Sequence, residues 1–313
     1  MDTTKTLETI TVASTSLPIL SPSDLDGQFF LGQLPYLSNS TLTTVYGNFQ
    51  GQPISFISLP SCVSLYANFS NCSKLTSLYL PNCVSIYSSS AFYNCSALSI
   101  VSLPVLTTFG YVSSIFTGCT NLQTVNIPNI TNISASGIFA RCTNLLNVNM
   151  PNLVSITGSQ VFSMCGLSIL SLPNLQTADD YTFASCSRLM KVNLPKGGVM
   201  CDTGCFERCT LLSIVALGTS NGVYIANSAF YSCQKLEYFI LSQITSAGTL
   251  ANSKAFYSTP LSISTYLGYY GSIYVPSSLV TTMQTTGNWA IYAARITSIE
   301  NLPASIKTEL GIE

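Results

Sequence analysis

The sequence contains no histidine, and charged residues make up only 7% of its 313 residues. An ordinary soluble domain has about 25% charged residues. Acidic residues are also missing from the whole stretch between Gly27 and Ala178. Because histidines and carboxylates perform most general acid–base catalysis, these two absences exclude most of that chemistry from nearly half of the chain.

Basic residues are equally scarce, and the net charge is −1. No lysine and arginine cluster could neutralise phosphates or attract an anionic membrane, so neither nucleic acid nor a membrane surface is an expected partner. No run approaches the roughly 18 apolar residues of a membrane-spanning helix. The charged N-terminus, with Pro18 breaking its short apolar piece, is not a signal peptide. Unless a signal was removed before Met1, we expect release by another route such as lysis, which favours a virion protein.

The sequence does contain a repeated motif, Phe-x-x-Cys. It occurs eight times, with successive cysteines 21 to 24 residues apart. A period of this length is typical of solenoids, in which each repeat forms one coil that stacks on the next. We expect the phenylalanines to form a buried column along the stack. The column consists of Phe69, Phe92, Phe116, Phe139, Phe162, Phe183, Phe206 and Phe230.

Each cysteine is followed by a second motif, Leu-x-x-Val-x-Leu-Pro, seen for example as Leu98, Val101, Leu103 and Pro104. In the last two copies Gly218 and Ser242 replace the proline. Val-x-Leu alternates with a period of two, which points both side chains to one face of a short strand. Proline ends the strand because it has no N–H to donate, and an asparagine after it indicates a turn with local bonding or a left-handed backbone. Stacked coils would place their strands about 4.8 Å apart, giving a stack of roughly 40 Å.

Together, the Leu-x-x-Val-x-Leu-Pro strands and segments such as Ala91-Phe92 and Val161-Phe162 closely resemble the BspA-like leucine-rich repeats, a treponemal-type subclass with a period near 23. The resemblance runs from about Ile54 to Phe256. It implies a β-rich leucine-rich-repeat solenoid, a right-handed coil with one or two short strands per repeat. The family includes bacterial cell-surface adhesins and relatives in phage and protist genomes, but it assigns a ligand to no particular residue.

The two ends of the chain do not repeat cleanly. We expect an N-terminal cap or attachment segment over residues 1–45, the solenoid over 46–260 and a C-terminal cap over 261–313. In the C-terminal cap, Ser272–Pro276 reads as a last strand, and Ser277 suits the N-cap of a short helix. Trp289 is expected to pack on the last coil, with a role as a binding anchor as the alternative. This ending resembles the cap of many gut-bacterial and phage members of the family.

Twelve cysteines raise three possibilities for the repeated thiols: buried free thiols, disulfides between coils, or a metal site. Adjacent coils would bring their cysteines about 5 Å apart, within the range of a disulfide. A ladder of free thiols is the simplest account, since a free cysteine packs as a small hydrophobe. Cys201, Cys205 and Cys209 follow a C-x3-C-x3-C spacing, one residue different from an iron–sulfur motif. No metal or other cofactor is therefore predicted.

No enzyme site is expected either. Asp179 and Asp180 are adjacent and point in different directions in an extended segment, and Glu207 lies beside Arg208, so they form no catalytic carboxylate pair. No histidine is present to activate a serine, and no Gly-x-Ser-x-Gly turn or phosphate-binding glycine loop occurs.

The best candidates for a binding site are the outward side chains between the core positions of the predicted strands. They form a row of small polar groups that could hydrogen-bond a glycan or a protein, or could simply be solvated. No concentration of aromatic side chains marks the row as an interface hot spot. The row consists of Tyr79, Ser102, Asn126, Asn149, Ser171 and Asn193.

We therefore predict a non-enzymatic protein on a virion, outside the cell or on a cell surface, where it binds a protein or a glycan. A host-binding component of a bacteriophage tail or capsid is the first hypothesis, and a bacterial cell-surface adhesin is the second. A third is a purely architectural subunit that contacts other virion proteins. Oligomerisation through the terminal segments remains open.

Overall fold

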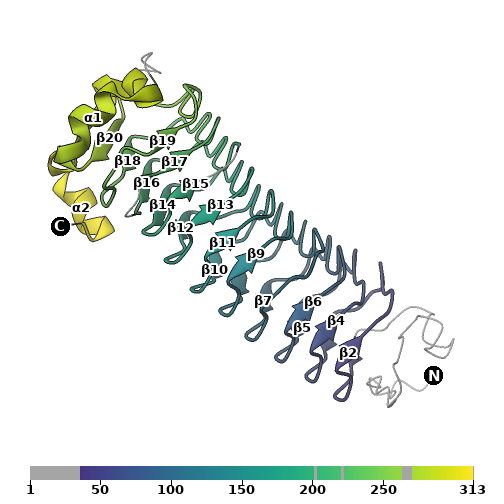
Figure 1. Cartoon of the computed structure of the whole chain (residues 1–313). Coiled ribbons are helices and arrows are strands. Elements are labelled where there is room, and N and C mark those ends of the chain that lie inside the picture. Colours follow the sequence, from purple (N-terminus) through teal and green to yellow (C-terminus); the bar gives the residue numbers. More distant parts are fainter. Residues whose placement is uncertain (1–35, 201–202, 220–221, 263–269, 313) are drawn as a thin grey trace, which may run out of the picture. The chain divides into compact units, whose positions relative to one another are not determined.

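The computed structural model describes residues 36–200, 203–219, 222–262 and 270–312. The chain divides into two compact units: unit 1 comprises residues 1–130 and 138–150, and unit 2 comprises residues 131–137 and 151–313. Each unit is a parallel β-solenoid in which most coils contribute two short strands (Figure 1). The predicted solenoid fold is confirmed, whereas the domain boundaries at residues 45 and 260 stay predictions. Most of the expected N-terminal cap lies outside the described residues.

The first sheet of unit 1 is built from the Val-x-Leu motifs. Its strands pair in parallel register, for example Val101 with Val125 and Val125 with Val148. Together called the first sheet, these strands form two three-stranded ladders: β1 (Tyr36–Ser38), β3 (Phe56–Ser58) and β5 (Ser77–Tyr79) pair in one, and β7 (Ile100–Ser102), β8 (Thr124–Asn126) and β10 (Asn147–Asn149) pair in the other. A second sheet lies further along each coil and consists of β2 (Thr44–Val45), β4 (Ser64–Leu65) and β6 (Ser85–Ile86).

Unit 2 repeats this arrangement with two sheets of six strands each. The first sheet consists of β12 (Ile169–Ser171), β14 (Lys191–Leu194), β16 (Ile214–Leu217), β18 (Tyr238–Ile240), β20 (Ser272–Val275) and β21 (Ile296–Ser298). The second sheet consists of β9 (Asn132–Ile133), β11 (Ser155–Ile156), β13 (Thr177–Ala178), β15 (Val199–Met200), β17 (Tyr224–Ile225) and β19 (Thr249–Leu250).

The phenylalanines of the repeat form a buried column in each unit. Neighbouring rings stack face to face, with centroids 5.0 to 5.6 Å apart. The column of unit 1 consists of Phe49, Phe69, Phe92, Phe116 and Phe139, and that of unit 2 of Phe162, Phe183, Phe206, Phe230 and Phe256. Burying one such side chain stabilises the fold by about 1.5–3 kcal/mol, so these columns are a main source of stability.

The cysteine three residues after each phenylalanine links neighbouring coils. The Cys119 Sγ donates a hydrogen bond to the Phe92 carbonyl of the preceding coil at 3.2 Å, and the Cys95 N–H donates to the same carbonyl. The same thiol bond is made by Cys72, Cys95, Cys142, Cys186, Cys209 and Cys233. Ten described cysteines are free and buried, whereas Cys205 is disulfide-bonded. The thiol ladder thus consists of free cysteines.

Most coils place a left-handed residue two positions before the phenylalanine and another two positions after it. Around Phe92 these are Ser90 (φ 59°) and Asn94 (φ 54°). Such residues bend the chain sharply and bring the ring inward. The conformation costs an L-residue about 1–2 kcal/mol, which the packing of the coil must outweigh.

The proline–asparagine turns form where the sequence predicts them, but the asparagines act differently from the expectation. The Asn82 Nδ2 donates to the Pro60 carbonyl of the preceding coil at 2.8 Å. Asn129 and Asn174 make the equivalent bond. None of these three described asparagines has a positive φ. They therefore link successive coils, and the expected local bonding or left-handed backbone was wrong.

The strand expected at Ser272–Pro276 is β20, in the region predicted as the C-terminal cap, but it is not the last strand. Ser277 opens the 3-10 helix η2 (Ser277–Leu279), whose N-cap is Pro276, so its predicted capping role was wrong. Trp289 is buried in η3 and 1% exposed. The sequence did not predict β21, which adds a parallel strand beside β20. The helical elements after η2 are α1 (Val280–Thr285), η3 (Gly287–Arg295), η4 (Ile299–Asn301) and α2 (Ala304–Leu310).

Candidate binding surfaces

The strand face of unit 1 is the outward side of β5, β7, β8 and β10. It carries four of the predicted site residues: Tyr79, Ser102 and Asn149 are exposed, and Asn126 is half-buried. The residues that alternate with them point inward: Val101 and Val125 are fully buried, and Leu78 and Val148 are half-buried. The period-two pattern therefore placed these side chains on the solvent side of the sheet.

Three of these side chains form a hydrogen-bonded row across the strands. The Asn126 Nδ2 donates to the Ser102 Oγ at 3.3 Å, and the Asn149 Nδ2 donates to the Asn126 Oδ1 at 2.6 Å. The row holds each amide in one orientation. It presents the Ser102 hydroxyl at one end and the Asn149 amide oxygen at the other, where a ligand can bind them.

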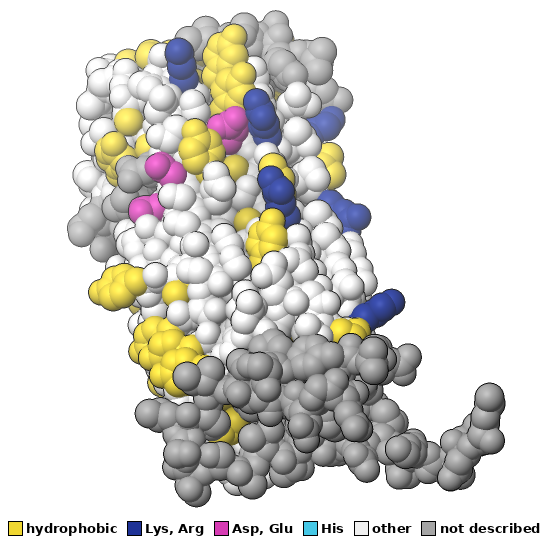
Figure 2. Space-filling view, turned by 90° about the vertical axis from the view of Figure 1, so that its right-hand side faces the viewer, with side chains coloured by type: hydrophobic (Ala, Val, Ile, Leu, Met, Phe, Trp, Pro, Cys, Tyr) yellow, Lys and Arg dark blue, Asp and Glu magenta, His cyan; other side chains and the backbone are white. Residues whose placement is uncertain are grey.

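Apolar side chains lie on the same face. Tyr79 is 52% exposed and Ile100 is 56% exposed. The only charged side chains among the described residues of unit 1 are Lys74 and Arg141. Figure 2 shows one side of the molecule, on which hydrophobic side chains gather in small groups and charged side chains are scattered. Such a surface suits uncharged partners, because it offers little to balance a ligand charge.

The strand face of unit 2 changes character along the sheet. Ser171 is exposed and Asn193 is half-buried, and they pair in register. The next positions in the row are apolar: Ala216, Ile240 and Tyr274. The C-terminal segment covers this apolar part with Leu302, Ile306, Leu310 and Ile312. Where the C-terminal segment covers the sheet, the outward side chains of the strands are therefore buried in a small second hydrophobic core.

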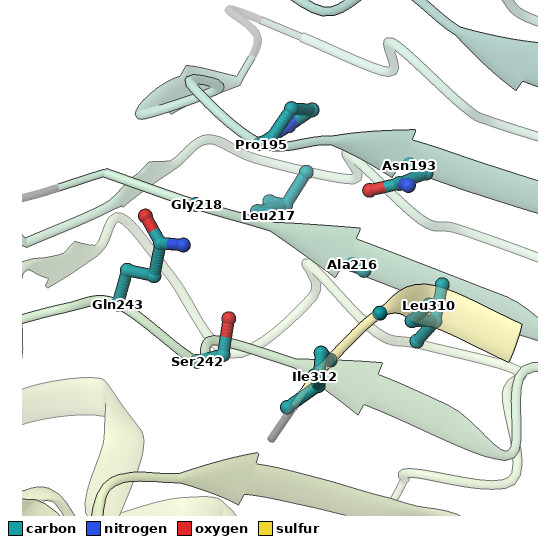
Figure 3. Close-up of a pocket in the computed structure, with 10 residues that line it drawn as sticks. Asn193, Pro195, Ala216, Leu217, Gly218, Ser242, Gln243, Leu310 and Ile312 are labelled. Atoms are coloured by element: carbon teal, nitrogen blue, oxygen red, sulfur yellow. The ribbon is translucent and has the colours of Figure 1, made fainter. Parts of the chain in front are cut away.

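A cleft lies where the C-terminal segment crosses this sheet (Figure 3). Its volume is about 320 Å³. Asn193, Ser242 and Gln243 line it with polar groups, and Leu310 and Ile312 line it with apolar ones. Beside α2, the Lys191 Nζ lies 2.8 Å from the Glu309 Oε1. An ion pair of this kind with an exposed partner stabilises by about 0–1 kcal/mol, so apolar contacts hold the segment in place.

The sequence analysis missed a second exposed row, which follows the second sheet of unit 1. Tyr46, Tyr66 and Tyr87 directly follow β2, β4 and β6, and their rings stack at centroid distances of 4.7 and 5.0 Å. The signal was available, because an apolar strand residue precedes each tyrosine at intervals of 20 and 21 residues. The row lies outside the Phe-x-x-Cys motif, which is why that motif did not reveal it.

The residues weighed for catalysis have structural partners. The Asp180 Oδ1 accepts a hydrogen bond from the Thr203 N–H. The Glu207 Oε1 lies 3.3 Å from the Arg208 Nε. Burial raises the pKa of Cys142 to about 12, which keeps this thiol protonated and unreactive at neutral pH.

Two further properties concern only the described ranges of the chain. No group of three histidine, cysteine, aspartate or glutamate side chains there could hold a metal ion. None of the helices there is long and apolar enough to cross a membrane.

Comparison with known proteins identifies one family. A model described as BspA type leucine rich repeat region (6 copies) matches residues 43–168, 112–237 and 156–308. No curated protein matches the sequence. A solved leucine-rich repeat protein from Bacteroides ovatus is 16% identical, with a TM-score of 0.42, and the alignment covers 84% of this chain and 83% of that one.

Two other solved structures are also similar. A leucine rich cell surface protein from Faecalibacterium prausnitzii is 18% identical, with a TM-score of 0.26 and coverage of 69% and 76%. A leucine rich repeat protein from T. pallidum is 18% identical, with a TM-score of 0.28 and coverage of 63% and 65%.

Proposed function

Because this chain belongs to the family of BspA-type leucine-rich repeat proteins, we propose that it is a non-enzymatic protein that binds a partner at a surface, in adhesion or attachment. Leucine-rich-repeat solenoids are typically non-enzymatic. The observation that carries the proposal is the strand face of unit 1. Its row of Ser102, Asn126 and Asn149 is ordered by cross-strand hydrogen bonds and open to solvent.

This row is suited to recognition because its side chains are already oriented. Binding orders flexible side chains at a cost of about 0.5–1.5 kcal/mol each, and a row fixed by its own hydrogen bonds avoids part of that cost. Tyr79 and Ile100 supply exposed apolar area beside the polar groups. A ligand with both hydroxyl or amide groups and apolar surface fits this combination.

We further propose that the protein acts on a bacteriophage particle, as a tail or capsid component that attaches the particle to its host. The scarcity of charge and the C-terminal ending, which resembles that of phage and gut-bacterial family members, support the proposal. A bacterial cell-surface adhesin is the alternative, and an architectural subunit bound to other virion proteins is the third. Fractionation of native material tests the choice: we expect the protein to sediment with phage particles, and recovery in a bacterial envelope fraction would favour the adhesin.

Cell binding by purified protein tests the binding proposal itself. We expect labelled protein to bind a bacterial or epithelial cell type saturably. Replacing Asn126 and Asn149 together with tyrosine would break the row and block the face, and should weaken binding at least tenfold. The matched control carries the same substitutions at Asn121 and Asn144, which lie in turns of the same coils, and should bind like the wild-type protein. Absence of binding by the wild-type protein to any cell would favour the architectural role.

A further inference from the structure

The cleft beside the C-terminal segment of unit 2 is large enough for a small ligand. Its volume of about 320 Å³ lies at the lower end of the range of small-molecule sites, about 300–1,000 Å³. Asn193 and Ser242 are half-buried in it, and Gln243 is exposed. Figure 3 shows that these polar side chains come from the sheet and its strand ends, whereas Leu310 and Ile312 come from the C-terminal segment. The cleft therefore combines polar groups from one element with aliphatic groups from another.

The repeat motif changes at this cleft. The register of β14, β16 and β18 places Pro195, Gly218 and Ser242 side by side at the ends of the strands. Proline occupies this position in the preceding coils, for example as Pro151 and Pro173. Serine is smaller than a proline ring and adds a hydroxyl group, and glycine contributes only backbone. The two exceptions to the motif thus leave space and hydrogen-bonding groups where the other coils carry a ring.

The polar side chains of the cleft are free to bind a ligand. In the described part of the chain, the side chains of Asn193, Ser242 and Gln243 form no hydrogen bond. Other asparagines of the repeat bond within the protein, as Asn174 does when its Nδ2 donates to the Pro151 carbonyl at 2.7 Å. The three side chains of the cleft have no such structural task, and their hydrogen-bonding groups are open to a ligand.

Charge is absent from the lining of the cleft. None of the described residues that line it carries a charged side chain. The neighbouring charges have partners elsewhere: Lys191 pairs with Glu309. The Lys196 Nζ donates to the Asn174 Oδ1 at 2.6 Å. A charged ligand would find no opposite charge in the cleft, so a neutral ligand is favoured.

The spacing of the polar groups restricts the size of the ligand. Asn193 and Gln243 lie two coils apart, so roughly 10 Å separates their strands. A single sugar ring with its substituents can span this distance. Its hydroxyl groups can exchange hydrogen bonds with amide and hydroxyl side chains, which both donate and accept.

The aliphatic side chains favour one kind of substituent on the sugar. The ion pair of Glu309 with Lys191 shows that Leu310 lies beside β14, the strand that carries Asn193. An amide and an aliphatic side chain are therefore present at the same end of the cleft. An N-acetyl group matches both, because its amide can exchange hydrogen bonds with Asn193 while its methyl group is buried against Leu310.

We propose that this cleft binds a neutral N-acetylated sugar, such as one N-acetylhexosamine unit of a glycan. The acetamide group bonds to Asn193, and its methyl group packs on Leu310 and Ile312. The ring hydroxyls bond to Ser242 and Gln243. This site goes beyond the proposed function, because it shares no residue with the strand face of unit 1 and does not depend on attachment to a cell.

Saturation-transfer NMR with the full-length protein tests the chemistry of the ligand. The probes are N-acetylglucosamine and N-acetylgalactosamine, compared with glucose and galactose, which lack the acetamide, and with glucosamine, which is positively charged. We expect transfer to at least one N-acetylated sugar, strongest at its methyl protons, and an affinity at least fivefold higher than that of the sugars without the acetyl group. Equal or tighter binding of those sugars, or no transfer to either N-acetylated sugar, would overturn the proposal.

Asn193→Ala tests the position of the acetamide group. We expect this variant to bind the N-acetylated sugar about tenfold more weakly, as the loss of a hydrogen-bonding partner predicts. The matched control is Gln234→Ala, which removes an exposed amide of unit 2 that does not line the cleft. The control should bind like the wild-type protein.

Ser242→Pro tests the cleft without removing an amide. It restores the residue that other coils carry at this position and fills part of the cleft with a ring, so sugar binding should be lost while the circular dichroism spectrum stays unchanged. If the proline disturbs the fold, Asn193→Ala alone decides. Full binding by a folded form of either variant would overturn the proposal. Cell binding is measured separately, so failure here leaves the proposed function intact, and absence of cell binding leaves this site intact.

Discussion

Left-handed residues are the most regular local feature of the coils and the least visible one in the sequence. They include types that rarely adopt this backbone, such as Arg141 (φ 60°), Gln160 (φ 58°) and Met164 (φ 58°). Serines, asparagines and glycines occupy equivalent positions in other coils. The position is therefore fixed by packing around the phenylalanine, and the residue type there is only weakly constrained.

Substitution of Arg141 tests this account. A β-branched side chain is strained at positive φ, so Arg141→Val should lower the free energy of unfolding by about 1–2 kcal/mol. Arg141→Gly should leave it unchanged or raise it, because glycine adopts this backbone freely. Denaturant unfolding measures both variants. Thr143→Val, two residues away at an exposed position without positive φ, should change stability little.

The buried thiols make stability depend on alkaline pH. Burial raises the pKa of Cys142 to about 12 and that of Cys72 to about 11, from an ordinary value of 9.0. Above pH 9 the unfolded chain therefore releases thiol protons that the folded chain retains. We expect the free energy of unfolding to fall as the pH rises from 9 towards 12, by about 1.4 kcal/mol per pH unit for each such thiol.

Cys142→Ser isolates one thiol, since serine does not ionise in this range. The free energy of unfolding of this variant should fall less steeply with rising pH than that of the wild-type protein. The difference in slope should equal the contribution of one thiol, whatever the stability of the variant at pH 7. Tyrosine ionisation is common to both proteins and cancels in the difference. Identical slopes for the two proteins would contradict the raised pKa as a source of alkaline instability.

Among the elements, the first-sheet strands were predictable and the two-residue strands were not. Val101 and Leu103 alternate clearly, whereas pairs such as Asn132–Ile133 and Thr177–Ala178 are too short to show a period. They are strands because the preceding and following coils hold them in register. The sequence did place Tyr79 and Ser102 on the outward side, but ligand binding by them remains a prediction.

The outward side chains of the first sheet of unit 2 indicate which part of the sheet the C-terminal segment covers. Outward positions change from Asn193 to Ala216 and Ile240, and this loss of polarity marks the area that the segment covers. Replacing Ile306 and Leu310 with aspartate should release the segment and expose that apolar area. We expect increased binding of a hydrophobic dye and self-association, measured by light scattering.

Glu309→Gln serves as the control for this element. It removes the ion pair with Lys191 and leaves the apolar contacts, so the free energy of unfolding should change by less than about 1 kcal/mol. Dye binding should stay at the wild-type level. Self-association of this variant would mean that the ion pair, and not apolar burial, holds the segment.

At the scale of the whole molecule, neighbouring coils within each unit bond to one another through a recurring set of contacts. These contacts are the strand pairs, the thiol bonds and the stacked phenylalanines. Stability in such proteins is approximately a sum over coils and their interfaces. This modularity explains why the motif spacing alone predicted the fold. The row of Tyr46, Tyr66 and Tyr87 lies outside the Phe-x-x-Cys motif, so that motif did not predict it.

Removal of a complete coil from unit 1 tests modularity. Deleting residues 96–119 joins Cys95 to Thr120 and preserves the motif order. We expect a folded protein with a smaller denaturant m-value, because less surface is buried. Deleting residues 96–107 instead removes half a coil and should prevent folding of the unit. Equal behaviour of the two deletions, measured by circular dichroism and denaturant unfolding, would contradict the modular account.

The scarcity of basic side chains has a practical consequence for finding the protein. Trypsin cleaves only after lysine and arginine, and none occurs between Lys74 and Arg141 or between Arg141 and Arg188. A standard digest would yield fragments from these stretches that are too long for routine mass spectrometry. A search for the protein in native material should therefore use an enzyme that cleaves after aromatic or aliphatic residues.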